Sequence, residues 1–259
     1  MMEELQFLRS SELIVRRELL RLGSAASAGF LLNHSIPGGI LMSDEKPIPA
    51  KTAVDHLILG AADLDQAIAW LEKTTGVKAV IGGVHPGRGT RNALVSLGGR
   101  QYLEILAPDP AQQVSVLPYN LKSVNAPRLI AWAAVTTDIN SVAEKSRSAG
   151  LNVSGPRDGS RARPDGRMLK WKSLDVGTGA GQERAALIPF FIEWAADSLH
   201  PSQDSPKGCE FQSFEMEHPD PASVIGALKK LGIEAKVKQA REARLRAMLK
   251  TPKGKVELS

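Results

Sequence analysis

The pattern of hydrophobic and polar positions has a unit that begins at residue 54. There, VDHLILGAADLDQAIAWLEKTTGVKAV alternates apolar and polar residues, places Asp63 before an amphipathic run, and ends that run at Gly76. Alternation predicts a β-strand, an Asp before a helix-periodic run predicts an N-cap, and a following Gly predicts the helix end. The stretch therefore predicts a strand, a helix and a second strand.

Two later segments repeat this order, LIAWAAVTTDINSVAEKSRSAGLNVSG from residue 129 and SFEMEHPDPASVIGALKKLGIEAKV from residue 213. Each has its own helix-capping Asp and helix-ending Gly, and each copy continues into strand-like segments. Every copy closes on an apolar, Glu, apolar triplet: Leu103-Glu104-Ile105, Ile192-Glu193-Trp194 and Val256-Glu257-Leu258.

These repeats predict an α+β protein built from βαβββ units. Such a unit has an open sheet that it cannot bury alone, so we expect two units to pair as a curved mixed sheet around a cleft. Residues 51–201 are predicted to form this paired domain, and residues 202–259 a third, smaller βαβ-type unit at the C-terminus. The third unit has an open side that predicts pairing with another subunit, as in a homodimer.

Several segments together resemble one protein family: DHLILGAADLDQAIAWLE, HPGRGTRNALVSLGG, YLEILAPD, APRLIAWA, SRARPDGRMLKWK and PFFIEW, which cover about residues 54–201. The chain resembles the vicinal oxygen chelate (glyoxalase/bleomycin resistance/dioxygenase) superfamily, and within it the glyoxalase-like domain group. The resemblance implies a small-molecule ligand. It leaves open a metal-dependent lyase or isomerase of glyoxalase type and a non-catalytic binding or sequestering protein of the same fold.

Metal-binding members of the superfamily take ligands from the first and last strands of both paired units, and the resemblance places these positions at His56, Glu104, Ala131 and Glu193. Ala131 has no ligand atom, so the resemblance implies one divalent ion held by His56, Glu104 and Glu193 with water. The alternative is that His56 is only a hydrogen-bonded partner in a polar cleft. Glu104 and Glu193 are also the candidate catalytic bases.

The string HPGRGTRN, from residue 85, lies between two predicted strands, where a loop can fold over the cleft. We expect His85 and Arg88 at the rim and Asn92 inside, and a similar loop, SRARPDGR, brings Arg163 from the second unit. Guanidinium forks match carboxylates and other oxygen-rich groups, so these residues, with His56, predict a small anionic or oxygen-rich ligand. The alternative is a tight turn whose arginines pair with nearby acids.

The formal charge of +5 comes from basic residues interspersed with acidic ones, without a run of five like charges. This distribution argues against nucleic acid as a partner. The single Cys209 excludes an internal disulfide and a cysteine metal cluster.

Residues 1–50 are predicted to be an N-terminal extension. Arg16 and Arg17 precede a moderately apolar run, a pattern typical of a twin-arginine export signal, and the apolar run is too short for stable insertion into a membrane. We expect export to the periplasm. The alternatives are a cytoplasmic protein with an amphipathic helix packed on the domain, or a true start at Met42.

Overall fold

The computed structural model describes residues 46–114, 118–177 and 187–259, which belong to one compact unit. The predicted export signal at Arg16 and Arg17 lies outside the described residues. The described chain begins with β1 (Ile48–Pro49) and α1 (Ala50–Ala53). Because Ile48 pairs with Ile233, the fold already includes residues 48 and 49.

The first unit consists of β2 (Val54–Gly60), α2 (Leu64–Thr75), β3 (Val80–His85), β4 (Thr90–Ser96) and β5 (Tyr102–Pro108). The Asp63 carboxylate accepts a hydrogen bond of 2.8 Å from the backbone N–H of Gln66 and so caps α2. Gly76 ends the helix in the left-handed conformation, with φ of 80°. The predicted helix boundaries are confirmed here.

The second unit repeats the order with β6 (Arg128–Val135), α3 (Ile139–Ser148), β7 (Asn152–Ala162), β8 (Met168–Gly177) and β9 (Phe190–Trp194). Asp138 caps α3 by accepting from the backbone N–H of Ser141. The short 3₁₀ helix η1 (Pro118–Ser123) lies between the two units. The two predicted βαβββ units are therefore present.

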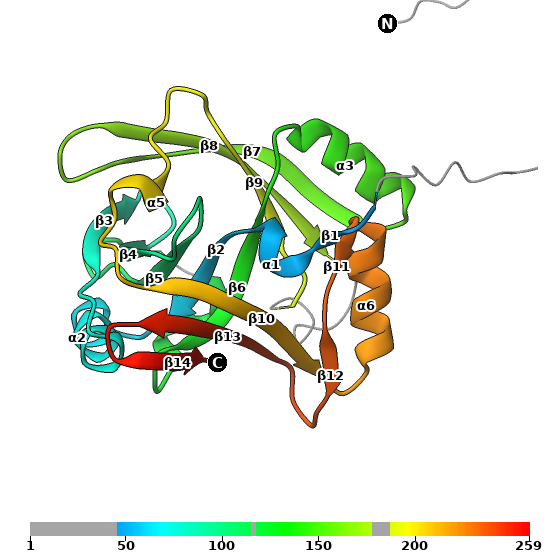
Figure 1. The fold of residues 1–259 in the computed structure, drawn as a ribbon. Helices are drawn as coiled ribbons and strands as arrows, with labels where there is room; N and C mark the ends of the chain where they lie inside the picture. The colour runs from blue at the N-terminus through cyan, green and yellow to red at the C-terminus, as the bar shows by residue number, and fades with distance from the viewer. Residues whose placement is uncertain (1–45, 115–117, 178–186) are drawn as a thin grey trace, which may run out of the picture. The chain divides into compact units, whose positions relative to one another are not determined.

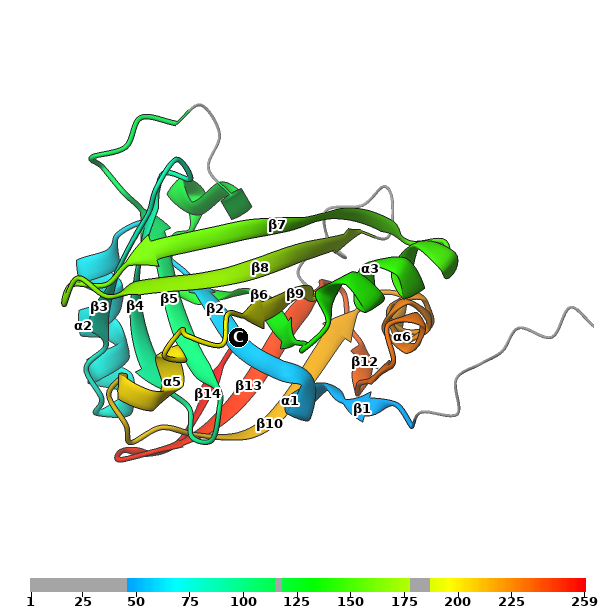
Figure 2. The ribbon, with the colours of Figure 1, turned by 90° about the horizontal axis from the view of Figure 1, so that it is seen from above.

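The two units share one curled sheet of eight strands in the order β3-β4-β5-β2-β6-β9-β8-β7. They join where β2 and β6 pair antiparallel. The edge strands β3 and β7 approach each other, and Arg161 Nη1 on β7 donates to the carbonyl oxygen of Gly82 on β3. The sheet is thus a half-barrel, and the long β7–β8 hairpin crosses it in Figure 2.

The third unit contains α5 (Pro201–Asp204), β10 (Glu210–His218), α6 (Pro221–Lys230), β11 (Ile233–Glu234), β12 (Val237–Gln239), β13 (Arg244–Thr251) and β14 (Gly254–Leu258). Its sheet has the order β12-β10-β13-β14, with β10 and β12 parallel on either side of the α6 connection (Figure 1). The predicted βαβ-type unit is confirmed. However, β14, the strand that carries Glu257, pairs with β13. It does not pair with β10, the first strand of its unit, in the way that β5 pairs with β2.

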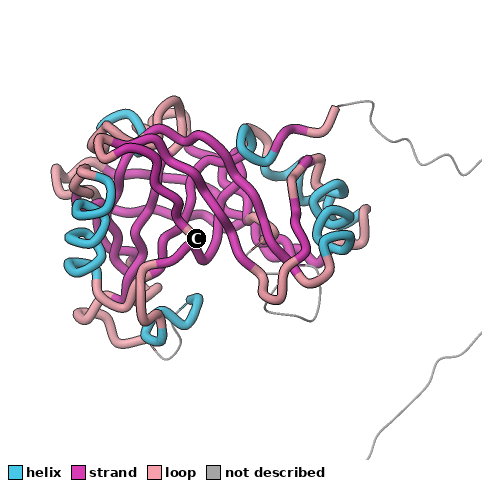
Figure 3. Tube along the Cα trace, turned by 60° about the horizontal axis from the view of Figure 1, so that its bottom comes forward, coloured by secondary structure: helices cyan, strands magenta, loops and turns pink. Residues whose placement is uncertain are grey.

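One hydrophobic core joins the eight-stranded and the four-stranded sheets. It contains Leu57 and Leu59 from β2, Trp132 from β6, and Phe214 and Leu249 from the third unit. In Figure 3 the helices lie outside the strands. Because β2 alternates, Leu57 and Leu59 face this core while His56 faces the inside of the half-barrel, where the polar residues lie.

Candidate functional site

The inner face of the first unit gathers polar side chains around Glu104. On β5, Glu104 lies beside Ile58 of β2 and Leu94 of β4, and Asn92 lies two residues before Leu94 on the same face. His56 of β2 and His85 at the end of β3 complete the group, which we name the Glu104 cluster: Glu104, His56, His85 and Asn92. Glu104, His56 and Asn92 are buried, and His85 is partly buried.

The Glu104 carboxylate is flanked on both oxygens. Asn92 Nδ2 donates to Glu104 Oε1 at 2.6 Å, while His56 Nε2 lies 3.6 Å from Oε2 and His85 Nε2 lies 3.7 Å from Oε1. A buried carboxylate requires such partners because desolvation of a charge is costly. Asn92 Oδ1, on the other end of the same amide, is buried without a hydrogen-bond partner among the described residues.

Gly82 and Arg161 close the half-barrel beside this cluster. A Cβ on Gly82 would lie 2.4 Å from Asn92 Oδ1, so the absence of a side chain on Gly82 makes room for Asn92. The buried Arg161 guanidinium, bound to the Gly82 carbonyl, interacts electrostatically with Glu104. Burial lowers the pKa of Arg161, and the negative charge of Glu104 opposes that shift.

His85 is held in an environment that favours its neutral form. Burial lowers its pKa, the charge of Glu104 opposes this, and the charges of Arg161 and Arg88 lower it further. Its Nδ1 lies 2.9 Å from Thr90 Oγ1, and its ring meets Trp171 edge-on with 6.5 Å between centroids. A neutral imidazole beside a carboxylate can accept or pass on a proton.

Behind His56 lies a second buried carboxylate, Asp55, which sequence reasoning missed. Asp55 Oδ1 lies 2.8 Å from His56 Nδ1, and Oδ2 lies 3.0 Å from His200 Nε2 and 3.1 Å from Trp194 Nε1. The β2–β6 register shifts between Val54 and His56, an irregularity that lets the neighbouring side chains of Asp55 and His56 meet. Burial would raise the pKa of Asp55, but the hydrogen bonds and charges of His200 and His56 lower it to about 2.

The structure does not bring Glu193 into the Glu104 cluster. Its Oε2 accepts a hydrogen bond of 2.7 Å from the backbone N–H of Ile139, so Glu193 caps α3 on the helix side of the sheet. The position in the second unit that corresponds to Glu104 is Phe190, because Ala133 pairs with Phe190 as Ile58 pairs with Glu104. The match between the sequence triplets had instead paired Glu104 with Glu193, which lies three residues after Phe190.

The divalent ion implied by the resemblance therefore does not fit the donors present. In the second unit, the positions that correspond to His56 and Glu104 carry Ala131 and Phe190, and Glu193 caps a helix. Within residues 46–114, 118–177 and 187–259, no group of three or more His, Cys, Asp or Glu side chains is arranged to hold a metal ion.

The arginines predicted to bind a ligand have different surroundings. Arg88 is exposed in the turn after β3, and its charge reaches His85, in keeping with a place at the rim. Arg163 pairs with Asp204, with Nη1 3.0 Å from Oδ1, and also with Asp165. It is therefore held by acids, and Arg161, two residues earlier, is the arginine that reaches the Glu104 surroundings.

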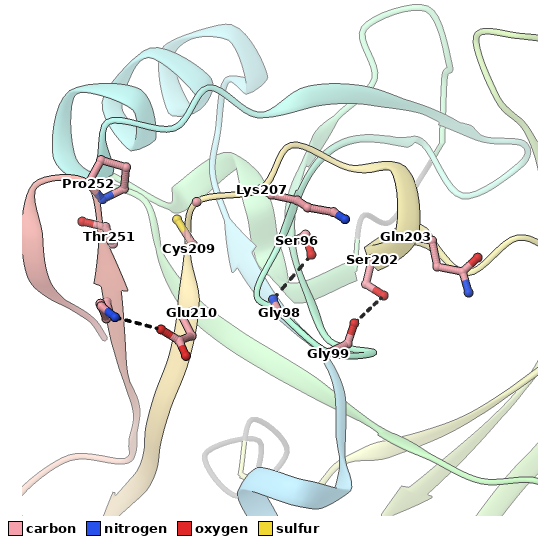
Figure 4. Close-up of a pocket in the computed structure, with 12 residues that line it drawn as sticks. Ser96, Gly98, Gly99, Ser202, Gln203, Lys207, Cys209, Glu210, Thr251 and Pro252 are labelled. Carbon is pink, nitrogen blue, oxygen red and sulfur yellow. Dashed lines mark hydrogen bonds and ion pairs between the residues drawn. The ribbon is translucent and has the colours of Figure 1, made fainter.

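Two cavities lie away from the Glu104 cluster. Figure 4 shows the larger, about 790 Å³, between the β4–β5 turn, the segment before β10 and the β13–β14 turn. Within it, Lys250 pairs with Glu210, and Ser202 Oγ bonds the Gly99 carbonyl. The second, about 500 Å³, is lined in part by Arg91, whose Nη2 lies 3.4 Å from Asp65 Oδ2. We base the site on the buried, converging groups around Glu104, because the charged side chains of these cavities are partnered or face solvent.

The curled eight-stranded sheet, with a polar cluster on its inner face and a small C-terminal sheet beside it, defines an α+β half-barrel protein. The family model described as the glyoxalase-like domain matches residues 54–232, and the chain belongs to this family. No curated protein sequence matches the chain significantly. None of the helices in the described part of the chain has the length and apolar character that crossing a bilayer requires.

A solved structure shows a similar fold over most of this chain, and two less similar structures match a little more than half of it. A hypothetical protein from Staphylococcus aureus is similar over 74% of this chain and 87% of its own, with 17% identity and a TM-score of 0.60. A variant of methylmalonyl-CoA epimerase from Streptomyces coelicolor, in complex with 2-nitronate-propionyl-CoA, matches 57% of this chain and 97% of its own, with 19% identity and a TM-score of 0.41. The epimerase from Mycobacterium tuberculosis matches 55% and 87%, with 19% identity and a TM-score of 0.37.

Proposed function

We propose that the chain binds a small, oxygen-rich organic ligand at the Glu104 cluster and that Glu104 moves a proton to or from that ligand. The observation that carries the proposal is the buried Glu104 carboxylate, with imidazole Nε2 atoms of His56 and His85 at 3.6 and 3.7 Å from its two oxygens. A carboxylate base next to imidazoles suits proton abstraction beside a carbonyl, the step shared by isomerases and lyases.

Three members of the cluster, Glu104, Asn92 and His85, have distinct parts in this proposal. Glu104 is the base, and Asn92 holds its Oε1 through the 2.6 Å hydrogen bond. The neutral His85 returns or relays the proton, and Arg88 at the rim attracts an oxygen-rich or anionic part of the ligand. The aromatic rings of Tyr102 and Phe190, both close to His56, exclude water from the reacting atoms. No step in this proposal passes through a metal ion.

The alternative is a protein that binds the ligand and does not transform it. The aromatic surroundings of the Glu104 cluster favour this second candidate, because Trp171 and Trp194 lie 5.7 Å apart between ring centroids and offer an apolar wall. Such a protein needs the cluster only for recognition.

An assay of hydrogen–deuterium exchange next to a carbonyl distinguishes the proton-transferring protein from the protein that only binds. The protein in D₂O is mixed with a panel of small aldehydes and ketones, and loss of the α-hydrogen signal is followed by NMR. We expect the unchanged chain to accelerate exchange of at least one compound and Glu104→Gln to slow it by about 100-fold or more, the range typical of a general base. Binding of the same compound by both proteins, with exchange accelerated by neither, contradicts proton transfer and favours the binder.

A further inference from the structure

The hydrogen bonds behind His56 determine which of its nitrogens carries the hydrogen, and thereby what the Glu104 cluster receives. We propose that Asp55 holds His56 in the tautomer with its hydrogen on Nδ1, and that the ligand group received between His56 Nε2 and Glu104 is an uncharged hydrogen-bond donor, such as the hydroxyl of a hydroxycarbonyl compound. This inference rests on the proposed function, since it assigns a ligand class to the same site.

The Asp55 carboxylate accepts hydrogen bonds from His56, His200 and Trp194. It is fully buried, and its ionised form is favoured by the pKa of about 2, so both oxygens act as acceptors. Trp194 Nε1 can only donate, and it does so to Oδ2 at 3.1 Å. The 2.8 Å contact of Oδ1 with His56 Nδ1 therefore requires a hydrogen on Nδ1.

His200 is fixed in the opposite tautomer. The backbone N–H of Ser202 donates to His200 Nδ1 at 3.3 Å, so Nδ1 is an acceptor and the hydrogen is on Nε2. That hydrogen points at Asp55 Oδ2, 3.0 Å away. Asp55 thus receives hydrogen bonds from three directions, and the orientation of the His56 ring is fixed from behind.

The tautomer leaves a lone pair on the other His56 nitrogen. In this tautomer the hydrogen is on Nδ1, so Nε2 presents an acceptor, and it faces a second acceptor, Glu104 Oε2, at 3.6 Å. Asn92 Oδ1 is a third buried acceptor, without a partner among the described residues. A donor hydrogen placed between His56 Nε2 and Glu104 Oε2 bonds one or both of these acceptors, and a ligand hydroxyl supplies it.

The charges of the buried residues disfavour an anion at this point. Asp55 and Glu104 are two carboxylates, whereas Arg161 is one cation, and its Nη1 is bound to the Gly82 carbonyl. A ligand carboxylate beside Glu104 would add a further negative charge in a poorly solvated place. The expectation of an anionic ligand, drawn from HPGRGTRN, therefore applies to the exposed Arg88 at the rim and not to the interior.

The tautomer can be measured directly on the unaltered protein. With ¹⁵N-labelled histidine at about pH 8, above the ordinary His pKa of about 6.5, long-range ¹H–¹⁵N spectra show which ring nitrogen carries hydrogen. The chain has five histidines, and His56→Gln identifies the signals of His56. We expect Nδ1 protonated and Nε2 unprotonated. Hydroxyacetone should shift the Nε2 signal, whereas acetone, which lacks the hydroxyl, and pyruvate, which carries a carboxylate, should not.

Asp55→Asn tests the positioning role. Its side-chain amide no longer demands a hydrogen on Nδ1, so we expect a mixture of His56 tautomers and hydroxyacetone binding weakened roughly threefold to tenfold, the equivalent of one neutral hydrogen bond. Trp194→Phe is the matched control, because it removes one donor to Asp55 and leaves the His56 contact, so the tautomer should not change. If Asp55→Asn does not fold, the spectra of the unaltered protein decide.

Three results would overturn the inference: a hydrogen on His56 Nε2 in the free protein, a larger response to pyruvate than to hydroxyacetone, or no response of His56 to any of the probes. The proposed function fails separately. If the tautomer and the hydroxyacetone response are as expected but Glu104→Gln leaves α-hydrogen exchange unchanged, Glu104 is not the base, and the assignment of the ligand class still holds.

Discussion

Phe190 occupies in the second unit the position that Glu104 occupies in the first. Each lies on the last strand of its unit and pairs with the residue five positions before the helix cap, Ile58 for Glu104 and Ala133 for Phe190. The Phe190 ring reaches across to His56, with 5.6 Å between ring centroids. The two units therefore share a fold, but only the first presents its polar set to the interior.

This relationship predicts how a metal site could be created. Ala131→His together with Phe190→Glu would place a second imidazole and a second carboxylate opposite His56 and Glu104, which supplies four ligands of the kinds that bind Zn²⁺ or Co²⁺. We expect the double variant to bind Co²⁺ at least about tenfold more tightly than the parent by calorimetry, with each single variant in between. Equally tight binding by the parent, lost in His56→Ala, would show that its own residues already hold the ion.

Gly82→Ala should disturb the site from the neighbouring strand. The new Cβ would lie 2.4 Å from Asn92 Oδ1 and 3.0 Å from Leu94, so the Asn92 side chain must leave the position from which it bonds Glu104. We expect a loss of about 1–3 kcal/mol in the free energy of unfolding, typical of overpacking, together with slower α-hydrogen exchange. Urea unfolding and the exchange assay measure the two effects.

The matched control is Gly226→Ala on the exposed face of α6, where an added Cβ meets no atom within 4 Å. A helical Gly replaced by Ala should gain about 0.5–1 kcal/mol of stability, with exchange unchanged. Unchanged stability and exchange in Gly82→Ala would mean that Asn92 does not depend on the space beside Gly82.

Asp55 should contribute to acid sensitivity. Its pKa is about 2 in the fold, below the ordinary Asp value of 3.8, so its contribution is fully present above the unfolded value and is lost as the pH falls through the folded value. The shift corresponds to about 2 kcal/mol, lost between about pH 4 and about pH 2. The free energy of unfolding, measured with urea across this pH range, should fall less steeply with acidification in Asp55→Asn than in the parent. The comparison is Asp165→Asn. Hydrogen bonds with Arg167 also lower the pKa of Asp165 to about 2, but this carboxylate is exposed, so solvent screening should keep the slope of Asp165→Asn close to that of the parent. An equal slope in Asp55→Asn and the parent would contradict the assignment.

Much of the fold could be predicted because it depends on local signals. Asp63 and Asp138 cap helices where the pattern placed caps, and apolar alternation separated the core residue Leu57 from the inward His56. The triplet around Glu257 on β14 did not predict how this strand pairs. In the third unit β10 pairs with β13, a long-range contact that a match of three residues does not predict.

The site was predictable only in part. Alternation and loop position brought His56, Asn92, Glu104 and His85 together, as the structure does. Glu193 was misplaced because a match of three residues cannot fix strand register, and a shift changes the face. Asp55 was overlooked, although an Asp next to a His within an otherwise apolar strand is a signal that a buried charge needs partners.

We also propose that the N-terminal segment directs export through Arg16 and Arg17. Replacing both by Lys should leave the protein in the cytoplasm, because the twin-arginine pathway recognises the pair itself and not its charge. Fractionation of a bacterial host into periplasm and cytoplasm measures this, with Arg9→Lys as a control. The same distribution for the parent and the double variant would refute export by this route.

The central claim is that Glu104, and not Glu193, moves the proton. The most direct measurement compares α-hydrogen exchange rates in D₂O for Glu104→Gln and Glu193→Gln. Glu193→Gln keeps an oxygen that can accept from the Ile139 N–H, so it should lose at most about 1 kcal/mol of stability and retain exchange. Glu104→Gln should remain folded and lose exchange by about 100-fold or more. Exchange that survives in Glu104→Gln and disappears in folded Glu193→Gln would contradict the account.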